Sequence, residues 1–347
     1  MLVDTGPDEC WPELRDRLSA IPKGPDGKRH IDLAVISHID HDHIGGAALL
    51  FGDKALELTF GDVWFNAPTR PATRGVAEGQ SLAEVLGAGD AKLPWNRAFA
   101  GQRVVTPAEG GFVEVPCREG EPKITVLSPA PKQLASLFKV WDKELERLRR
   151  KEHDKAVAAA GATRGRVALD PKVLAAKVTS VDRAPANGSS IALLVEHGNA
   201  SVLLAADAFA GVLVPALGAL ARQRRQTRGL KVDALKLSHH GSRGNVTVDL
   251  LKAIRADHYI VSTNGAIFNH PDDEAIARVV VHGGRHPKLW FNYDNERCRR
   301  WADAKLRALH GFDVTMPKQD GVGIELELGA PPPSPAVPVT LVGKRHA

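Results

Sequence analysis

The sequence predicts an α/β fold, and three observations support this prediction. Apolar runs at 33–36 and 124–128 have the composition of buried strands, and the second run is stopped by a proline. Stretches with helical character lie between the strands, beginning with 11–18. Two further apolar runs, 191–195 and 201–207, are joined by a short turn, which is typical of a β-hairpin. Strands that alternate with helices are characteristic of α/β proteins.

The first half of the chain opens on a short apolar strand that ends in a turn. A helix, a loop rich in glycine and proline, and a buried strand follow in order. The expected elements of this half are strands at 1–6, 33–36, 62–66, 101–105 and 124–128, helices at 11–18, 47–50 and 81–86, and a loop at 22–28.

The second half begins with a heavily charged helical pattern from 134 to about 160, followed by a flexible or partly helical return over 161–185. The final residues, 329–347, are rich in proline and are expected to form a disordered tail. The strands expected here are 191–195, 201–207, 234–237, 259–262, 288–291 and 323–328.

The composition indicates a globular protein with a large core. The chain has 347 residues, 43% hydrophobic and 25% charged, which suffices for one large domain or two. It shows neither an apolar run long enough for a bilayer nor a leader, so we expect a soluble, cytoplasmic protein without membrane contact. Cys10, Cys117 and Cys298 are widely spaced and are expected to be thiols. The formal charge of +5 is compatible with a polyanionic partner but is weak evidence by itself.

The strand at 33–36 leads into the most informative stretch of the chain, Ser-His-Ile-Asp-His-Asp-His-Ile-Gly-Gly at 37–46. In an extended chain the side chains of His38, Asp40 and Asp42 point to one side, and His41 points to the other. His43 follows where two glycines permit a tight turn. Imidazoles and carboxylates this crowded are satisfied together by a divalent cation, so the pattern predicts a metal site. A polar loop that caps the next helix is the alternative.

The order of these residues resembles the His-x-His-x-Asp-His signature of metallo-β-lactamase-fold hydrolases, with Asp40 in place of the second histidine. The variant His-x-Asp-x-Asp-His followed by Gly-Gly is similar to the hydrolase domain of ComEC-type DNA-uptake proteins and their free-standing relatives. The resemblance implies an αββα four-layer sandwich over 1–328, with the charged stretch at about 134–185 as a surface insertion. It also implies a strand before Met1, so we expect either an open sheet edge or an upstream extension of the chain.

The second half supplies further candidates for the metal centre. Asp207 follows an apolar strand, where the family places a metal-bridging aspartate, although Ala206 replaces the usual glycine. A helix N-cap is the alternative role of Asp207. A His-His-Gly-Ser string at 239–242 is the second match to the ComEC-like pattern. One histidine is expected to bind metal, and we favour His239, with His240 and Ser242 facing the substrate or supporting the ligands.

Two positions are less determined by the pattern. His270 precedes a proline and is expected either to contact a leaving group or phosphate, or to be structural. The family usually has a third histidine near 187–190, where this chain has Asn187, Ser189 and Ser190. The resulting site is rich in oxygen, so two ions of zinc or manganese are expected, with magnesium as an alternative.

These residues predict a hydrolase that uses a metal-activated water. The expected metal ligands are His38, Asp40, Asp42, His43, Asp207 and His239, the expected catalytic residues are Asp42, His240 and His270, and the expected substrate contacts are Asn187, Ser242, Arg224 and Arg225. The favoured substrate is a phosphodiester in DNA or RNA, because of the ComEC-like motifs and the arginines upstream of His239. A hydrolase of lactones, thioesters or cyclic nucleotides is the alternative enzyme, and a binding or regulatory module without turnover is the alternative class.

Overall fold

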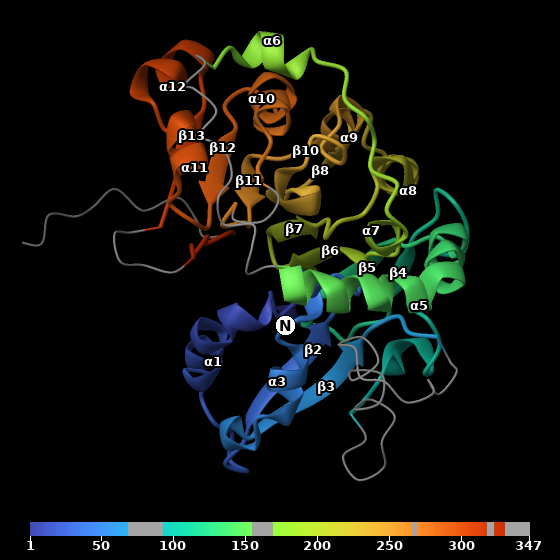
Figure 1. Cartoon of the computed structure of the whole chain (residues 1–347). Helices are drawn as coiled ribbons and strands as arrows, with labels where there is room; N and C mark the ends of the chain where they lie inside the picture. The colour runs from blue at the N-terminus through green and yellow to red at the C-terminus, as the bar shows by residue number, and fades with distance from the viewer. Residues whose placement is uncertain (69–92, 155–168, 266–268, 318–322, 330–347) are drawn as a thin grey trace, which may run out of the picture.

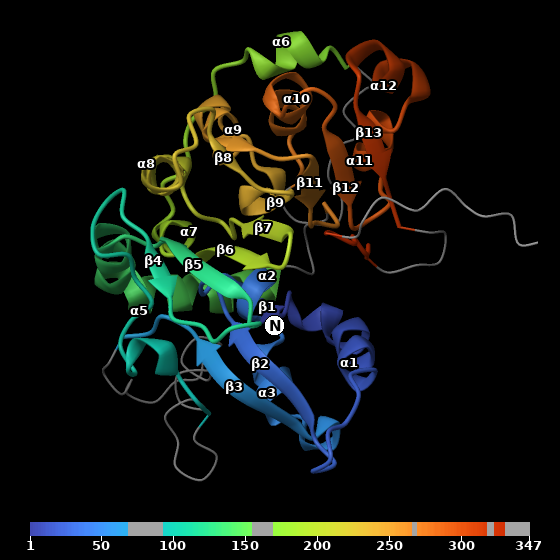
Figure 2. The same ribbon diagram turned by 180° about the vertical axis from the view of Figure 1, so that it is seen from behind.

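Two main β-sheets carry the fold in the computed structural model, which describes residues 1–68, 93–154, 169–265, 269–317 and 323–329. The larger sheet is mixed and is covered by helices, so the prediction of an α/β fold is confirmed. Figure 1 shows the smaller sheet, in blue, at one end of the molecule and strands β11, β12 and β13 toward the other, and Figure 2 shows the same arrangement from behind. No helix of the described residues is both long and apolar enough to cross a membrane.

The smaller sheet consists, in the described residues, of three parallel strands in the order β1-β2-β3. Strand β1 lies at one edge, where Leu2 pairs with Ala34 and Val3 with Val35. The strand bounds are β1 (Leu2–Val3), β2 (Arg29–Val35) and β3 (Leu58–Trp64).

The larger sheet has eight described strands in the order β13-β12-β11-β9-β7-β6-β5-β4. The pairs from β13 to β7 are parallel, and those from β7 to β4 are antiparallel. The strand bounds are β4 (Val113–Val115), β5 (Lys123–Ser128), β6 (Ala192–His197), β7 (Ala200–Leu204), β9 (Ala234–Lys236), β11 (His258–Val261), β12 (Lys288–Phe291) and β13 (Asp313–Thr315). A separate parallel pair is formed by β8 (Leu230–Lys231) and β10 (Ile254–Arg255).

The described α-helices are α1 (Trp11–Ser19), α2 (His41–Ile44), α3 (Ala47–Gly52), α5 (Pro131–Asp154), α6 (Pro171–Ala175), α7 (Pro185–Gly188), α8 (Ala210–Gln223), α9 (Val248–Ala253), α10 (Asp273–His282), α11 (Glu296–Trp301) and α12 (Ala304–His310). Short 3-10 helices are η1 (Asp8–Cys10), η2 (Lys54–Leu56), η3 (Arg97–Phe99) and η4 (Ser238–Gly241).

The core is divided by the two sheets. Val35 and Trp64 of the smaller sheet pack with Val126 and Leu193 of the larger sheet in one apolar cluster. Because side chains alternate along a strand, Leu194 points to the opposite face. That face forms a second cluster with helices α8 and α10, and the outer face of the smaller sheet forms a third with α3 and α5. Each sheet therefore has one face toward the other sheet and one face toward helices.

Helix α5 contributes to this core. Leu134, Leu137 and Trp141 are buried, and the last two belong to the cluster on the smaller sheet. The start of the stretch expected as a charged insertion is thus packed against the domain. Residues 155–168, in the middle of that stretch, lie outside the described residues.

Four expected elements differ from the structure or lie beyond its description. Residues 101–105 form no strand. The backbone N–H and carbonyl of Val104 form hydrogen bonds with the side chain of Asn66, at 2.9 and 2.8 Å, instead of with the backbone of a neighbouring strand. Residues 323–328, expected as a strand, pair with no described strand, so the last described strand is β13. The helix expected at 81–86 and the tail from 330 lie outside the described residues.

Candidate metal centre

The polar residues of the centre follow the carboxyl ends of parallel strands. Ser37 and His38 come after β2, Asp207 after β7, His239 and His240 after β9, and Ser262 after β11. The carboxyl ends of parallel strands are the usual position of a ligand site in an α/β sheet.

The loop after β2 departs from the extended conformation expected for 38–43. Helix α2 begins at His41, with the backbone of Asp40 still extended. The prediction that His41 points away from the other histidines agrees with its contact to Asp8, at 2.9 Å from Nε2. The chain then turns tightly at Gly45, where a Cβ atom would lie 2.7 Å from the carbonyl oxygen of His41. Any other residue at position 45 would force the turn open.

Asp207 lies three residues beyond β7 and is 2% exposed. It is not a helix cap, because the N-cap position of α8 is occupied by Phe209. Ala206 has a φ of +45°, a conformation that favours glycine. The backbone just before the Asp207 carboxylate is therefore strained. The backbone N–H of Asp207 donates to Ser190 Oγ at 3.3 Å.

His239 and His240 sit on a strained turn. Their φ angles are +47° and +53°, and such a conformation costs about 1–3 kcal/mol per residue. The backbone N–H of His239 donates to the carbonyl oxygen of Ala206 at 2.9 Å, which ties the two strained loops together. Strained left-handed residues cluster at functional sites, and here they lie on both sides of one hydrogen bond.

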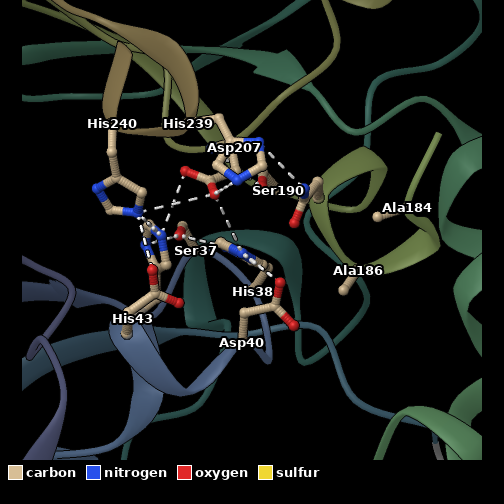
Figure 3. A network of polar contacts seen from close by, with 12 residues as sticks. Ser37, His38, Asp40, His43, Ala184, Ala186, Ser190, Asp207, His239 and His240 are labelled. Carbon is tan, nitrogen blue, oxygen red and sulfur yellow. Dashed lines mark hydrogen bonds and ion pairs between the residues drawn. The ribbon is translucent and has the colours of Figure 1, made fainter. Parts of the chain in front are cut away.

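The Nε2 atoms of four histidines converge on the carboxylate of Asp207, as Figure 3 shows. His43 Nε2 lies 3.2 Å from Oδ1 of Asp207. The distances to Oδ2 are 3.7 Å from His239, 3.9 Å from His38 and 3.9 Å from His240.

The other ring nitrogen of each histidine faces an outer partner. His43 Nδ1 lies 2.7 Å from Asp4 Oδ2, and His240 Nδ1 lies 2.6 Å from the carbonyl oxygen of Ser262. His239 Nδ1 lies 3.1 Å from Asp182 Oδ2. Carboxylates and carbonyls only accept hydrogen bonds, so each of these Nδ1 atoms donates its proton outward.

His38 also carries its proton on Nδ1, and here the outer partner is the hydroxyl of Ser37. The hydroxyl of Ser37 donates to Asp4 Oδ2 at 2.8 Å, so Ser37 Oγ can only accept from His38 Nδ1 at 3.0 Å. In the neutral form of all four rings, a lone pair on Nε2 therefore faces Asp207. Histidine ligands of metals have this arrangement, with an outer acceptor for the second ring nitrogen.

The electrostatics of the centre favour positive charge where the rings meet. Burial disfavours a charged imidazole, but the carboxylates of Asp207 and Asp4 outweigh burial and raise the pKa of His43 well above its usual value. Burial likewise opposes ionisation of Asp207, yet His43 and His240 hold its pKa well below the usual range. A proton on one ring offsets this crowding only in part, whereas a cation would contact several donors at once.

Three groups of side chains in the described residues could hold a metal ion, and two of them belong to the centre: His38, His43 and Asp207, and Asp42, His43 and His240. The third group, Asp8, Glu9 and His41, lies on the side to which His41 points. Asp40 adds a carboxylate oxygen 3.8 Å from His38 Nε2. Two buried ligand atoms, His38 Nε2 and Asn187 Oδ1, have no hydrogen-bond partner among the described residues, and Asp207 Oδ1 contacts His43 Nε2 at 3.2 Å. The donors thus fit a divalent cation, which would satisfy buried atoms that are otherwise left without partners.

The structure brings both His239 and His240 to Asp207, with His240 on the side of Asp42. His240 Nε2 lies 3.0 Å from Asp42 Oδ2 and 3.1 Å from His43 Nε2. His239 lies on the other side of Asp207, near Asn187, whose Nδ2 is 3.3 Å from His239 Nδ1. The sequence could not separate the two histidines, because the strained turn decides where each ring points.

Three other predicted residues lie at the centre or beside it. Asn187 Nδ2 donates to Asp182 Oδ2 at 2.6 Å, and the hydroxyl of Ser242 accepts from the N–H of Gly244 at 3.3 Å. The ring of His270 lies 5.2 Å from that of His239, measured between centroids. Burial, and then the neighbouring His239, lower the pKa of His270 to about 4, so this ring is neutral near pH 7.

The two arginines expected to contact substrate are not brought to the centre. Helix α8 starts near Asp207 and has 14 residues, so its far end lies about 20 Å away. Arg224, at that end, pairs with both carboxylate oxygens of Glu196 at 2.7 Å. Arg225 lines a surface pocket. A run of basic residues upstream of His239 in sequence does not place them near it in space.

Sequence reasoning missed the outer partners, Asp4 and Asp182. Asp182 Oδ2 accepts from Asn187 and Asn245 and contacts His239. The sequence offered one signal for Asp4, because Asp4 comes where the first predicted strand ends and so could lie beside the strand that leads into the 37–46 motif. Asp182 had none, since it precedes a helix in a segment without periodicity.

Comparison with known proteins finds no family model and no curated protein that matches the chain. Support for an activity therefore comes from the residues of the centre.

Proposed function

We propose that this chain is a metal-dependent hydrolase of the metallo-β-lactamase fold. The observation that carries the proposal is the convergence of four Nε2 atoms on Asp207, each ring with its second nitrogen held from outside. The contact between the two sheets, with helices on their outer faces, supports the αββα four-layer arrangement for the fold. The His-x-Asp-x-Asp-His and His-His-Gly-Ser strings support a ComEC-like member.

Two divalent cations fit the donors. One would be held by His38, Asp40 and Asp207, with His239 beside it, and the other by Asp42, His43, Asp207 and His240. When bound, such ions lower the pKa of a water molecule toward neutrality and offset negative charge on the attacked group. The oxygen-rich first position favours manganese or magnesium over zinc.

The residues of the chain prepare this centre before substrate arrives. Asp4, Asp182 and the carbonyl of Ser262 hold the rings in one tautomer, so the donors need no rearrangement. Burial of His38 and Asp207 excludes bulk water and strengthens every charge interaction in the centre. His270 is neutral beside His239, so it can form a hydrogen bond to a leaving group without adding repulsion between cations.

A phosphodiester of DNA or RNA is the substrate class we propose. Arg183 and Arg243 are the basic residues we propose as phosphate contacts, because both are exposed and directly follow Asp182, which contacts His239, and Ser242 of the His-His-Gly-Ser string. Arg243 also lies 3.9 Å from Glu274. They take the place of Arg224 and Arg225 as candidate phosphate contacts. The competing classes are a small-molecule hydrolase and a module without turnover.

The test incubates purified protein with labelled oligonucleotides, a cyclic dinucleotide, and a chromogenic lactone or thioester under manganese, magnesium and zinc. We expect oligonucleotide cleavage by wild type and none by Asp42→Ala, because that variant loses a donor oxygen at 3.0 Å from His240. Asp26→Ala, an exposed carboxylate in a loop, is the matched control and should retain activity. Cleavage confined to the lactone or thioester would overturn the substrate class. Identical behaviour of wild type and Asp42→Ala on all substrates would favour the module.

A further inference from the structure

A basic pocket lies at the end of α8 that is farthest from the metal centre. Its volume is about 510 Å³, and it is formed where the end of α8 meets the loop before β8 and the end of α9. The charged residues of its lining are Arg222, Arg225 and Lys252, all of them exposed. The lining contains no carboxylate.

The charge of the pocket is not neutralised by the protein. Among the described residues, the side chains of Arg222, Arg225 and Lys252 form no ion pair, whereas the adjacent Arg224 is paired with Glu196. The segment 218–232 contains no aspartate or glutamate. Burial, followed by the charge of Lys252, lowers the pKa of the nearby His282, which agrees with a positive field here.

Stabilisation of helix ends explains only part of this charge. Helices α8 and α9 both end at the pocket, and each carboxyl end carries about half a negative charge. Three full positive charges against two such ends leave a net charge of about +2. A purely structural role would require fewer cations than the pocket contains.

The backbone shapes the pocket as well. Gly229 has a φ of +81°, and a Cβ atom there would lie 2.9 Å from the carbonyl oxygen of Lys252, so the loop reaches the end of α9 only with glycine. Arg225 has a φ of +54° despite its side chain. Gln226 Oε1 accepts from the backbone N–H of Lys231 at 2.7 Å and closes this loop. The wall of the pocket is thus a defined turn.

We propose that this pocket binds a phosphate-bearing anion, at a site separate from the metal centre. Guanidinium groups bind phosphate oxygens in a bidentate manner, and a lysine adds a third positive charge for an anion with several phosphate groups. The anion is either a stretch of nucleic-acid backbone or a free oligophosphate such as that of a nucleotide. The proposal does not depend on the hydrolase activity.

The experiment measures binding by the full chain with chelator present, so that metal-bound phosphate does not contribute. The probes are inorganic tripolyphosphate, followed by calorimetry, and a labelled single-stranded oligonucleotide, followed by fluorescence anisotropy. We compare wild type with the triple variant Arg222→Gln, Arg225→Gln, Lys252→Gln. The matched control changes three exposed lysines elsewhere and removes the same charge: Lys28→Gln, Lys172→Gln, Lys305→Gln.

We expect the triple variant to bind at least one probe about tenfold more weakly, and the control variant to change by less than about twofold. For the oligonucleotide, the slope of log affinity against log salt should fall by about 2, since each lost phosphate contact removes about 0.7. Loss confined to the oligonucleotide identifies a nucleic-acid strand as the ligand, and loss confined to tripolyphosphate identifies a free oligophosphate. Equal affinities of the triple and control variants, or no binding of either probe by wild type at low salt, would overturn the proposal. Circular dichroism checks the fold of both variants.

Discussion

Asp4 Oδ2 lies 2.7 Å from Nδ1 of His43, and this contact joins the edge strand of the smaller sheet to the candidate metal centre. The same carboxylate accepts from the backbone N–H and hydroxyl of Ser37, at 2.7 and 2.8 Å. Through Ser37 it also sets the tautomer of His38. One residue outside the predicted metal motif thus orients two of its histidines.

Asp4→Asn should weaken the binding of manganese or zinc about 10- to 100-fold, because an amide is a poorer acceptor for the His43 proton. Calorimetric titration of the metal-free protein measures this affinity. Asp26→Asn, an exposed loop substitution, is the control and should bind as wild type does. Equal affinity of Asp4→Asn and wild type would show that Asp4 plays no part in metal binding.

Metal should stabilise the folded chain. A cation at 100 times its Kd adds about 2.7 kcal/mol to the free energy of unfolding, provided that it does not bind the unfolded chain. Differential scanning calorimetry should show a higher Tm with manganese or zinc than with chelator, and Asp207→Asn should lose most of this difference. A Tm that does not respond to metal, together with less than about half an equivalent of bound metal by elemental analysis, would contradict the proposed centre.

The two neighbouring histidines should have separable effects. His240→Ala should reduce the metal bound per chain from about two ions to about one, because His240 faces Asp42 and His43. His239→Ala and Asp182→Asn should instead weaken the ion near His38, since Asp182 holds His239 at 3.1 Å. Elemental analysis after dialysis gives the stoichiometry, and titration gives the affinity. The assignment fails if His239→Ala, and not His240→Ala, removes the ion at Asp42.

Arg278→Met should destabilise the protein by about 3 kcal/mol, since a buried guanidinium and its acceptors lose their hydrogen bonds. Arg278 is 4% exposed and donates to the carbonyls of Arg243, Val246 and Lys177 at 2.7–2.9 Å. Urea unfolding followed by circular dichroism measures the change. Arg255→Met, at an exposed position, should stay within about 0.5 kcal/mol of wild type. Similar losses in both variants would indicate a general effect of removing charge.

The elements that the sequence predicted well are those with a strong local pattern. The apolar run at 124–128 is β5, and the runs at 191–195 and 201–207 give the paired strands β6 and β7. The expected strand at 101–105 failed because Asn66, far along the chain, occupies the backbone groups of Val104. Local composition carries no information about such a partner.

The sequence by itself determined the α/β class and pointed to most of the residues that the structure brings together at the candidate centre, because strand periodicity and the 37–46 motif are properties of neighbouring residues. The tertiary structure decided how those donors are used. It selected His240 for the Asp42 side, supplied Asp4 and Asp182 from positions 39 and 57 residues away from the histidines they contact, and placed Arg224 and Arg225 at the far end of α8. The physical reason is that a hydrogen bond or metal contact depends on distance in space, and the packing of the two sheets sets that distance.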